Sequence, residues 1–212
     1  MSESEGEGLE VLVGPAALAR RVGELGAEIA AVYAGRGAPP LAVGILRGST
    51  PFLADLVRAM DLDVEVDFMS ISSYGGSEGS GVVRILKDLE QDIGGRDVLV
   101  VEDIVDTGLT LAYLRRALAA RSPRSVRAAT LLDRRARRIV PVPVEHVGFE
   151  IPDVFVVGYG LDWHGQWRNL AAVVAVREPA GAAAAGLERL LKAGRGQASE
   201  ATRRPHTGRG GC

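Results

Sequence analysis

The segment Val98–Leu111, VLVVEDIVDTGLTL, carries the side chains with the clearest chemical potential. Its apolar start predicts a buried strand ending at Val101, which places Glu102 and Asp103 at the carboxyl edge of a sheet, where open α/β sheets bind ligands. The run 106–110, DTGLT, then leads into a predicted helix. Its glycine allows a tight turn, and the unpaired N–H groups and dipole at a helix start favour an anion. The segment therefore predicts a cradle for a phosphate monoester.

The two carboxylates need a partner other than the phosphate, because like charges repel. Vicinal ribose hydroxyls donate well to carboxylates, and a magnesium ion prefers oxygen ligands. The segment thus fits a ribose 5-phosphate better than a plain strand-to-helix turn with an aspartate cap, because the complete pattern is far more specific than Asp-Thr-Gly alone. The residues expected to touch the ribose and its phosphate are Glu102, Asp103, Asp106, Thr107, Gly108, Leu109 and Thr110.

Hydrophobic periodicity predicts the elements that position this segment. Apolar residues spaced by three and four indicate a helix from Pro15 to about Gly35. Further helices are predicted at Pro51–Met60 and Thr110–Ala120. Short apolar or alternating runs predict strands at Leu9–Val13, Leu41–Leu46, Val64–Ile71, Val82–Leu86, Val98–Val101, Ser125–Leu132, Val154–Tyr159 and Ala171–Val176. Strands that alternate with helices predict an α/β fold with a central, mostly parallel sheet flanked by helices.

Composition narrows the class of protein. The 212 residues are 47% hydrophobic and carry a formal net charge of −2, which fits one α/β domain and gives no reason to expect nucleic acid. The only cysteine is Cys212, so no internal disulfide or cysteine-based zinc site can form. The acidic N-terminus does not resemble a signal peptide, and no apolar run approaches the length of a membrane span. We therefore expect a cytoplasmic protein without a membrane partner.

The two ends of the chain differ from its centre. Residues 1–8 are rich in Gly, Ser and Glu, and residues 179–212 are rich in Ala, Gly and Arg. Both are predicted to be disordered, apart from a possible short helix around Ala183–Leu191. The domain is expected to span residues 9–178.

The segment Val98–Leu111 resembles the signature of type I phosphoribosyltransferases, and the chain from about Leu9 to Val176 resembles the hypoxanthine-guanine phosphoribosyltransferases. The resemblance implies the type I fold, with a small hood and a flexible lid loop beside the central sheet. It also implies purine salvage, in which the 5-phosphoribosyl group of phosphoribosyl pyrophosphate passes to hypoxanthine or guanine to give IMP or GMP and pyrophosphate. Mg²⁺ would be the cofactor, and the chain would form a homodimer or homotetramer.

Two loops resemble parts of the family that close around the donor substrate. GILRGSTPF, Gly44–Phe52, is similar to the pyrophosphate loop, which implies that Arg47 and Gly48 bind pyrophosphate beside a cis peptide bond at Leu46–Arg47. The family often has Lys in place of Arg47. SSYGGSEGSG, residues 72–81, is polar and glycine-rich and resembles the flexible lid, with Ser73 and Tyr74 as its marker pair.

The block Val147–Leu170 resembles the family's purine site. The resemblance implies that Phe155 lies over the purine ring and that the backbone of Val156 meets its Watson–Crick edge. Asp162 would border the purine and bind a second magnesium ion, in addition to an ion near Glu102 and Asp103. Arg168 would bind the pyrophosphate.

Arg134 stands where the family usually has a lysine that donates to the purine 6-oxygen. A guanidinium can also donate there, but its fork is wider and its reach differs, which leaves the preference among hypoxanthine, guanine and xanthine open. Arg135, Arg137 and Arg138 are predicted to form a solvated basic loop. The resemblance assigns the general base to Asp106, which would accept the purine N7 proton while N9 attacks C1′.

Three other hypotheses remain. A related transferase could act on xanthine, adenine or orotate. A non-catalytic regulator could bind nucleotide and nucleic acid, although the negative net charge and the presence of Asp106, Asp162 and Arg168 argue against it. The basic tail could dock a partner or nucleic acid. The three histidines, His146, His164 and His206, lack metal-ligand spacing and are assigned no role.

Overall fold

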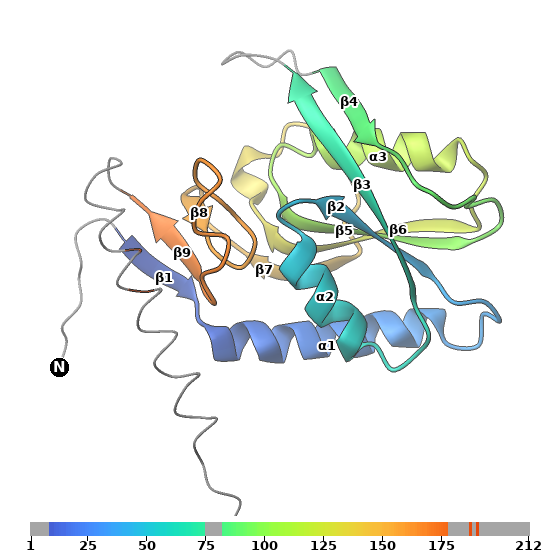
Figure 1. Ribbon diagram of the computed structural model, residues 1–212, viewed down its shortest axis with the longest axis horizontal. Helices are drawn as coiled ribbons and strands as arrows, with labels where there is room; N and C mark the ends of the chain where they lie inside the picture. Colours follow the sequence, from blue (N-terminus) through green and yellow to red (C-terminus); the bar gives the residue numbers. More distant parts are fainter. Residues whose placement is uncertain (1–8, 75–81, 178–186, 188–189, 191–212) are drawn as a thin grey trace, which may run out of the picture.

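The computed structural model describes residues 9–74, 82–177, 187 and 190. Its helices are α1 (Pro15–Tyr33), α2 (Thr50–Ala59) and α3 (Leu109–Ala119), with a short 3-10 helix, η1 (Arg135–Arg137). Its strands are β1 (Leu9–Val13), β2 (Leu41–Leu46), β3 (Glu65–Tyr74), β4 (Val82–Lys87), β5 (Asp97–Val105), β6 (Ser125–Asp133), β7 (His146–Glu150), β8 (Phe155–Val157) and β9 (Val173–Val176). They form two sheets (Figure 1).

The larger sheet has six strands in the order β4-β3-β2-β5-β6-β7. Its pairs β2–β3, β2–β5, β5–β6 and β6–β7 are parallel, and only β3–β4 is antiparallel. The predicted mostly parallel sheet is therefore confirmed. Because parallel strands end at one edge, the carboxyl ends of β2, β5, β6 and β7 share one edge, where ligands bind in such sheets.

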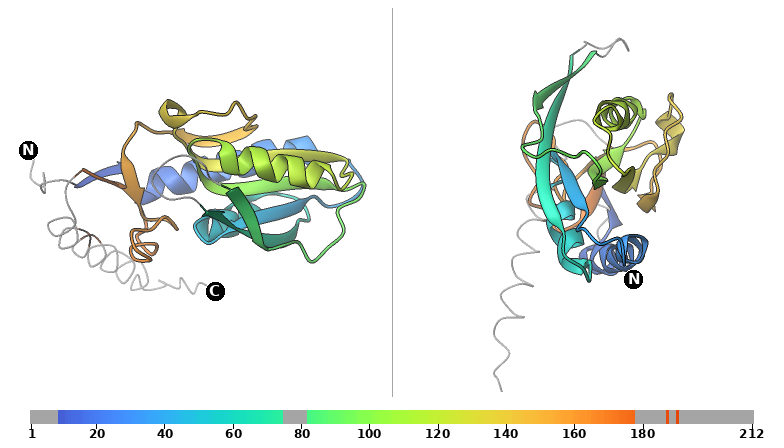
Figure 2. Two further views of the ribbon diagram at one scale, coloured as in Figure 1. Left: turned by 90° about the horizontal axis from the view of Figure 1, so that it is seen from above. Right: turned by 90° about the vertical axis from the view of Figure 1, so that its right-hand side faces the viewer.

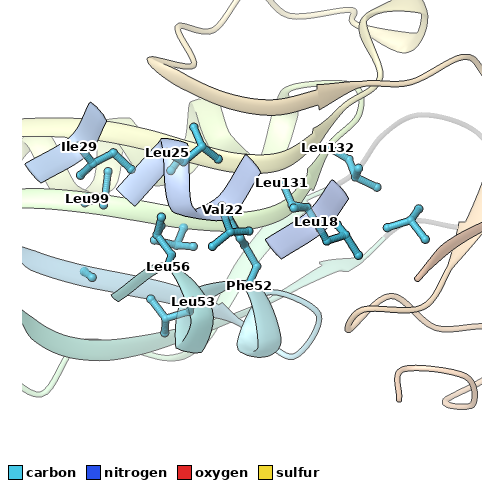
Figure 3. Close-up of a cluster of buried hydrophobic side chains, with 14 of the residues drawn as sticks. Leu18, Val22, Leu25, Ile29, Phe52, Leu53, Leu56, Leu99, Leu131 and Leu132 are labelled. Carbon is cyan, nitrogen blue, oxygen red and sulfur yellow. The ribbon is translucent and has the colours of Figure 1, made fainter. Parts of the chain in front are cut away.

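Helices cover both faces of this sheet. One face packs against α1 and α2, whose leucines and phenylalanine meet Leu99, Leu131 and Leu132 of β5 and β6 (Figure 3). The other face packs against Leu111, Leu114 and Leu118 of α3 (Figure 2). Successive β5 residues alternate between the two clusters, as the pleat of a strand requires. Burial on both faces fixes the register of β5 and the position of its last residues.

The smaller sheet is the predicted hood. It is antiparallel, in the order β1-β9-β8, so it joins the first strand of the chain to the two last ones. Figure 1 shows it beside the end of the central sheet where β2 passes into α2. Leu187 is fully buried against hood residues Val157, Leu170, Val174 and Val176. Leu187 and Leu190 lie within the range 183–191, where the sequence allowed a short helix, whereas residues 1–8 and the rest of the tail lie outside the described residues.

Several boundaries differ from the predictions. The strand expected to end at Val101 continues to Val105, because its pairing with β6 extends to Val105 and Asp133. Glu102 and Asp103 thus lie in the last part of β5 rather than after it. β7 was not predicted, and β8 is shorter than expected because Gly158 and Tyr159 adopt positive φ values. In the part of the chain that is described, no helix has the length and apolar character needed to cross a membrane.

Candidate active site

The turn between β5 and α3 is shaped for an anion. Gly108 has a φ of 85°, and a Cβ placed there would lie 2.6 Å from the carbonyl oxygen of Val140. Gly108 is the N-cap of α3 and has no side chain that could bond the first turn. The N–H of Leu109 donates to Oγ1 of Thr107 at 3.4 Å, and the N–H groups that follow it at the helix start have no intrahelical partner, so they and the helix dipole favour a negative group there. The predicted phosphate cradle has the expected backbone.

A neighbouring loop holds this cradle in place. The backbone N–H groups of Ile139 and Val140 both donate to the carbonyl of Thr107, at 3.0 and 3.1 Å. The Nε of Arg138 donates to the carbonyl of Asp106 at 3.1 Å, and its other end pairs with the buried Asp133. Arg138 is therefore a structural anchor of the cradle, and its prediction as a solvated residue is wrong. The fold, rather than local spacing, brings it to the turn.

Glu102 and Asp103 bring negative charge to the edge of the sheet. Glu102 is 5% exposed. Burial, together with the neighbouring charge of Asp103, raises the pKa of the Glu102 carboxyl well above its usual range. Burial also raises the pKa of Asp103, although the backbone N–H of Ile104 and the charge of Arg168 work in the opposite direction. The surroundings of both acids oppose ionisation. Such a pair indicates a site where a hydrogen-bond donor or a cation from a ligand would stabilise the carboxylates.

Three segments predicted separately converge at Asp103. The Leu46–Arg47 peptide bond is cis, as the resemblance implies, and is followed by the buried Gly48. A Cβ on Gly48 would lie 1.6 Å from Oδ2 of Asp103. A Cβ on Gly160 would lie 1.9 Å from the carbonyl of Gly48. The β2–α2 loop, the end of β5 and the loop after β8 therefore touch one another at positions where only glycine fits.

Arg168 and Asp162 form an ion pair on the hood side of this junction. Nη2 of Arg168 lies 2.7 Å from Oδ1 of Asp162, and its Nη1 donates to the carbonyl of Gly160 at 2.6 Å. The charges of both residues act on Asp103. Arg47, by contrast, is exposed. The pair therefore lies close to the converging loops, where a ligand with negative charge could replace Asp162 as the partner of Arg168.

Phe155 lines an open pocket on the hood. Its side chain is 46% exposed, and its ring meets Trp163 edge-on at 6.2 Å between centroids. The pocket has a volume of about 310 Å³ and is lined by Phe155, Asp162, Trp163, His164 and Val176. Val156 is buried on β8. An exposed aromatic face above an open pocket suits the stacking of a flat ring, and His164, which was assigned no role, belongs to its wall.

Arg134 lies beside Asp106. Its Nε is 3.9 Å from Oδ1 of Asp106, and both atoms are buried and lack a hydrogen-bond partner. Arg134 as a residue is only 8% exposed, whereas Arg135 and Arg137 are exposed as predicted. Because buried polar atoms in folded proteins nearly always have a partner, this unpaired donor and acceptor are a candidate recognition site for a group that offers one of each.

The predicted metal ligands do not form a ready-made cage. Within the described ranges, no group of three or more His, Cys, Asp or Glu side chains could hold a metal ion by itself. Glu102, Asp103 and Asp162 still fit a magnesium ion, because Mg²⁺ usually takes one or two carboxylates and completes its shell with water and substrate phosphate. The burial and mutual repulsion of these acids is what a cation would relieve.

The predicted lid is only partly visible. Ser73 and Tyr74 form the end of β3, paired with Val83 and Val82 of β4, so the strand extends beyond Ile71, where it was expected to end. Residues 75–81 lie outside the described residues.

Two contacts at the site were not foreseen from the sequence. Asp153 pairs with both Arg134 and Arg137. The hydroxyl of Tyr159 donates to Asp55 of α2, which ties the loop after β8 to the helix that follows the β2–α2 loop. An acid after Ile-Pro and a tyrosine between two glycines have no characteristic spacing, so the sequence held no signal for either contact.

Known proteins are similar to this chain in sequence and in fold. A family model described as the phosphoribosyl transferase domain matches residues 15–164. The hypoxanthine phosphoribosyltransferase of Salmonella typhimurium is 50% identical over 166 residues, covering 78% of this chain and 93% of that protein. The hypoxanthine-guanine phosphoribosyltransferase of Bacillus subtilis is 45% identical over 172 residues, covering 81% and 94%.

A solved structure of the Trypanosoma cruzi hypoxanthine phosphoribosyl transferase has a TM-score of 0.78 against this fold and 39% sequence identity. It covers 84% of this chain and 95% of its own. The chain therefore belongs to the phosphoribosyltransferase family and, within it, to the hypoxanthine and hypoxanthine-guanine phosphoribosyltransferases.

Proposed function

We propose that this chain transfers the 5-phosphoribosyl group of phosphoribosyl pyrophosphate to hypoxanthine or guanine, giving IMP or GMP and pyrophosphate. The observation that carries the proposal is the pair of buried, unpartnered atoms beside the phosphate cradle, Oδ1 of Asp106 and Nε of Arg134. A 6-oxopurine presents an N7 proton and a 6-oxygen on one edge. The acceptor on Asp106 and the donor on Arg134 match that edge.

In this proposal the donor substrate binds where the β2–α2 loop, the end of β5 and the loop after β8 converge. Its 5-phosphate binds the start of α3 through residues 107–110, and its ribose hydroxyls donate to Glu102 and Asp103. Arg168 and the β2–α2 loop, with Arg47 and Gly48, bind the pyrophosphate. Arg47 and Arg168 can each hold a phosphate oxygen pair in a bidentate manner. The segment that begins at Ser73 and Tyr74 acts as a lid that excludes water during transfer.

A magnesium ion completes the acidic positions in this proposal. Glu102 and Asp103 would hold one ion and Asp162 another, because Mg²⁺ needs only one or two carboxylates beside water and phosphate oxygens. When bound, the metal neutralises the negative charge that develops on the leaving pyrophosphate. Asp162 would be a ligand of such an ion, and the guanidinium of Arg168, now paired with Asp162, would bind the pyrophosphate.

The acceptor base binds between the hood and the cradle. Phe155 stacks on the purine ring, and the backbone of Val156 together with Asp162 borders its Watson–Crick edge. Arg134 donates to O6, and Asp106 accepts the N7 proton as N9 attacks C1′ and the bond to pyrophosphate breaks. The ribosyl carbon passes through an oxocarbenium-like state, as in other glycosyl transfers. Positioning and charge stabilisation supply much of the rate.

Arg134 also accounts for the choice of base. The 6-amino group of adenine would place its N–H donors against the guanidinium N–H donors, and the buried donor would stay unpaired. A 6-oxo group accepts from the same donor. The proposal therefore includes selectivity for 6-oxopurines over adenine.

The proposed assembly, location and extent of the catalytic unit follow from the similarity to the relatives. We include in the proposal a homodimer or homotetramer, a cytoplasmic location and a catalytic unit of residues 9–178. The Trypanosoma cruzi structure was determined in work on how its C-terminal region affects oligomeric state and enzymatic activity. Size-exclusion chromatography with light scattering measures the assembly of this chain directly.

Initial rates with four bases test the function. Full-length protein is assayed by ultraviolet absorbance with phosphoribosyl pyrophosphate, Mg²⁺ and one of hypoxanthine, guanine, xanthine or adenine. We expect nucleotide formation with hypoxanthine or guanine and a rate with adenine that is lower by about tenfold or more, because one unpaired buried donor weakens binding by about that factor. Transfer to adenine alone, or no transfer to any base, contradicts the proposal.

A further inference from the structure

Asp106, Arg134, Asp153 and Arg137 form a closed ring of alternating charge. Oδ1 of Asp106 lies 3.9 Å from Nε of Arg134, whose Nη1 lies 3.6 Å from Oδ1 of Asp153. The same Asp153 oxygen lies 2.9 Å from Nε of Arg137, whose Nη1 lies 3.7 Å from Oδ2 of Asp106. The members come from the turn after β5, the residue between β6 and η1, η1 itself and the segment between β7 and β8. This ring therefore exists only in the folded chain.

The four contacts of the ring differ in length. The Asp153–Arg137 contact is within hydrogen-bonding distance, whereas the other three are longer than a hydrogen bond, and the Asp106–Arg134 contact is the longest. The longest contact joins the two buried atoms without partners, Oδ1 of Asp106 and Nε of Arg134. Arg138 is not available as a partner for Oδ1 of Asp106, because its guanidinium is bound to the Asp106 carbonyl and to Asp133. The ring thus offers one free acceptor and one free donor at this contact.

We propose that Asp153 is a positioning residue for the purine, which keeps Arg134 away from Asp106 so that both stay free for the base. The inference rests on the proposed function. Arg134 is a buried cation, and a buried cation requires a counter-charge. Asp153 supplies that charge at Nη1 of Arg134, whereas Asp106 lies nearest to its Nε. Without Asp153, the nearest remaining carboxylate in the ring is Asp106 itself.

The consequence is specific to the acceptor base. A direct Arg134–Asp106 ion pair would occupy both groups that meet the purine edge, and the base would have to break that pair in order to bind. The donor substrate binds Glu102, Asp103 and the start of α3, which Asp153 does not contact in any interaction found among the described residues. Loss of Asp153 should therefore weaken hypoxanthine and leave phosphoribosyl pyrophosphate unaffected.

Steady-state kinetics of Asp153→Asn test the inference. We expect kcat/KM for hypoxanthine to fall about tenfold, the effect of losing one charge-assisted contact, while KM for phosphoribosyl pyrophosphate changes less than about twofold. Asp153→Glu, which keeps the charge, should recover most of the loss. The side chain of Asp153 is 51% exposed, so the variant is expected to fold, and its thermal midpoint checks this.

Glu150→Gln is the matched control. Glu150 is the last residue of β7, three positions before Asp153, and pairs with Arg135 at 2.9 Å, and neither Glu150 nor Arg135 belongs to the ring. The control removes the same charge nearby and should leave both substrates unaffected. An equal loss in Glu150→Gln would show a general charge effect and would overturn the inference.

A double-mutant cycle separates positioning from a merely structural role. A lysine at position 134 lacks the Nε donor that faces Asp106, so Asp153→Asn should cost less in an Arg134→Lys background than in the wild type. Equal costs in the two backgrounds, or an unchanged kcat/KM in Asp153→Asn, would overturn the role of Asp153. Failure of the proposed function is recognised separately, because the wild-type protein would then show no transfer to hypoxanthine.

Discussion

The two ends of β5 differ in whether their buried carboxylates have partners within the protein. At the amino end, Asp97 is buried and fully paired, with Arg36 and Arg124 each at 3.1 Å and the hydroxyl of Ser125 at 2.6 Å. Burial opposes its ionisation, but these partners outweigh burial, and the pKa of Asp97 lies below its usual value. Asp97 ties the loop after α1 and the start of β6 to the central strand, so it serves the fold.

At the carboxyl end, Glu102 and Asp103 lie side by side in sequence, and burial raises the pKa of both carboxyls. Within the described part of the chain, no ion pair to either carboxylate is found, and the charge of Asp103 adds to the burial of Glu102. The same strand therefore stabilises one acid with its own partners and leaves two others to be completed by a ligand. Unpaired buried charge is a cost in stability that marks a functional site.

Replacing Asp106, just beyond this carboxyl end, should have the largest effect. Asp106→Asn removes the proposed general base, so kcat should fall by about 10²- to 10⁴-fold and by more than KM for phosphoribosyl pyrophosphate rises. Stopped-flow or steady-state absorbance with hypoxanthine measures both constants. An unchanged kcat would show that Asp106 is not the general base.

Asp103→Asn should separate activity from stability. Removing a ligand of the ribose and metal should lower kcat/KM on the order of 10²-fold. Removing one of two repelling buried charges should also leave the ligand-free protein as stable as the wild type, or more stable by about 1 kcal/mol. Urea unfolding followed by circular dichroism gives the free energy of unfolding. A marked loss of stability would mean that Asp103 is a structural residue like Asp97.

Asp97→Asn is the same substitution at the other end of the strand and should give the opposite result. Loss of charge-assisted contacts should lower the free energy of unfolding by about 2 kcal/mol. The activity of the folded fraction should stay close to that of the wild type, because Asp97 lies at the amino edge of the sheet. A loss of kcat without a loss of stability would break the contrast between the two ends.

The smallest expected effect is on the pH dependence of stability. Because the pKa of Asp97 is lowered in the folded chain, its contribution is complete above the unfolded value, about 3.9, and is lost as the pH falls through the folded value. The difference in unfolding free energy between wild type and Asp97→Asn should therefore narrow from pH 6 towards about pH 3. A difference that stays constant over this range would show that the ionised form of Asp97 adds nothing.

Local sequence predicted the parts of the site that are continuous in the chain. The turn around Gly108, the glycine at position 48 and the order of most strands follow from runs of apolar residues and from residue types with special backbone requirements. The length of β5 did not follow, because it depends on pairing with β6 as far as Asp133. β7 was missed because Val147, Phe149 and their neighbours are only partly buried and lack a continuous apolar run.

Side chains that act across loops could not be predicted. Arg138 and Arg137 are close in sequence and chemically identical, yet one anchors the cradle through Asp106 and Asp133 and the other closes the charge ring through Asp153. The burial of Leu187 against the hood likewise depends on contacts far along the chain. Sequence indicates which residue types are available, and tertiary contacts decide which of them meet.

Thermal unfolding with and without phosphoribosyl pyrophosphate and Mg²⁺ tests the contrast between the two ends of β5 most directly. At a saturating concentration, the account predicts that the wild type and Asp97→Asn gain about 3 kcal/mol, or a midpoint rise of roughly 5–10 °C. Asp103→Asn should gain less than about half of that rise, because the acid that the donor substrate completes is absent. An equal rise in Asp103→Asn would contradict the account.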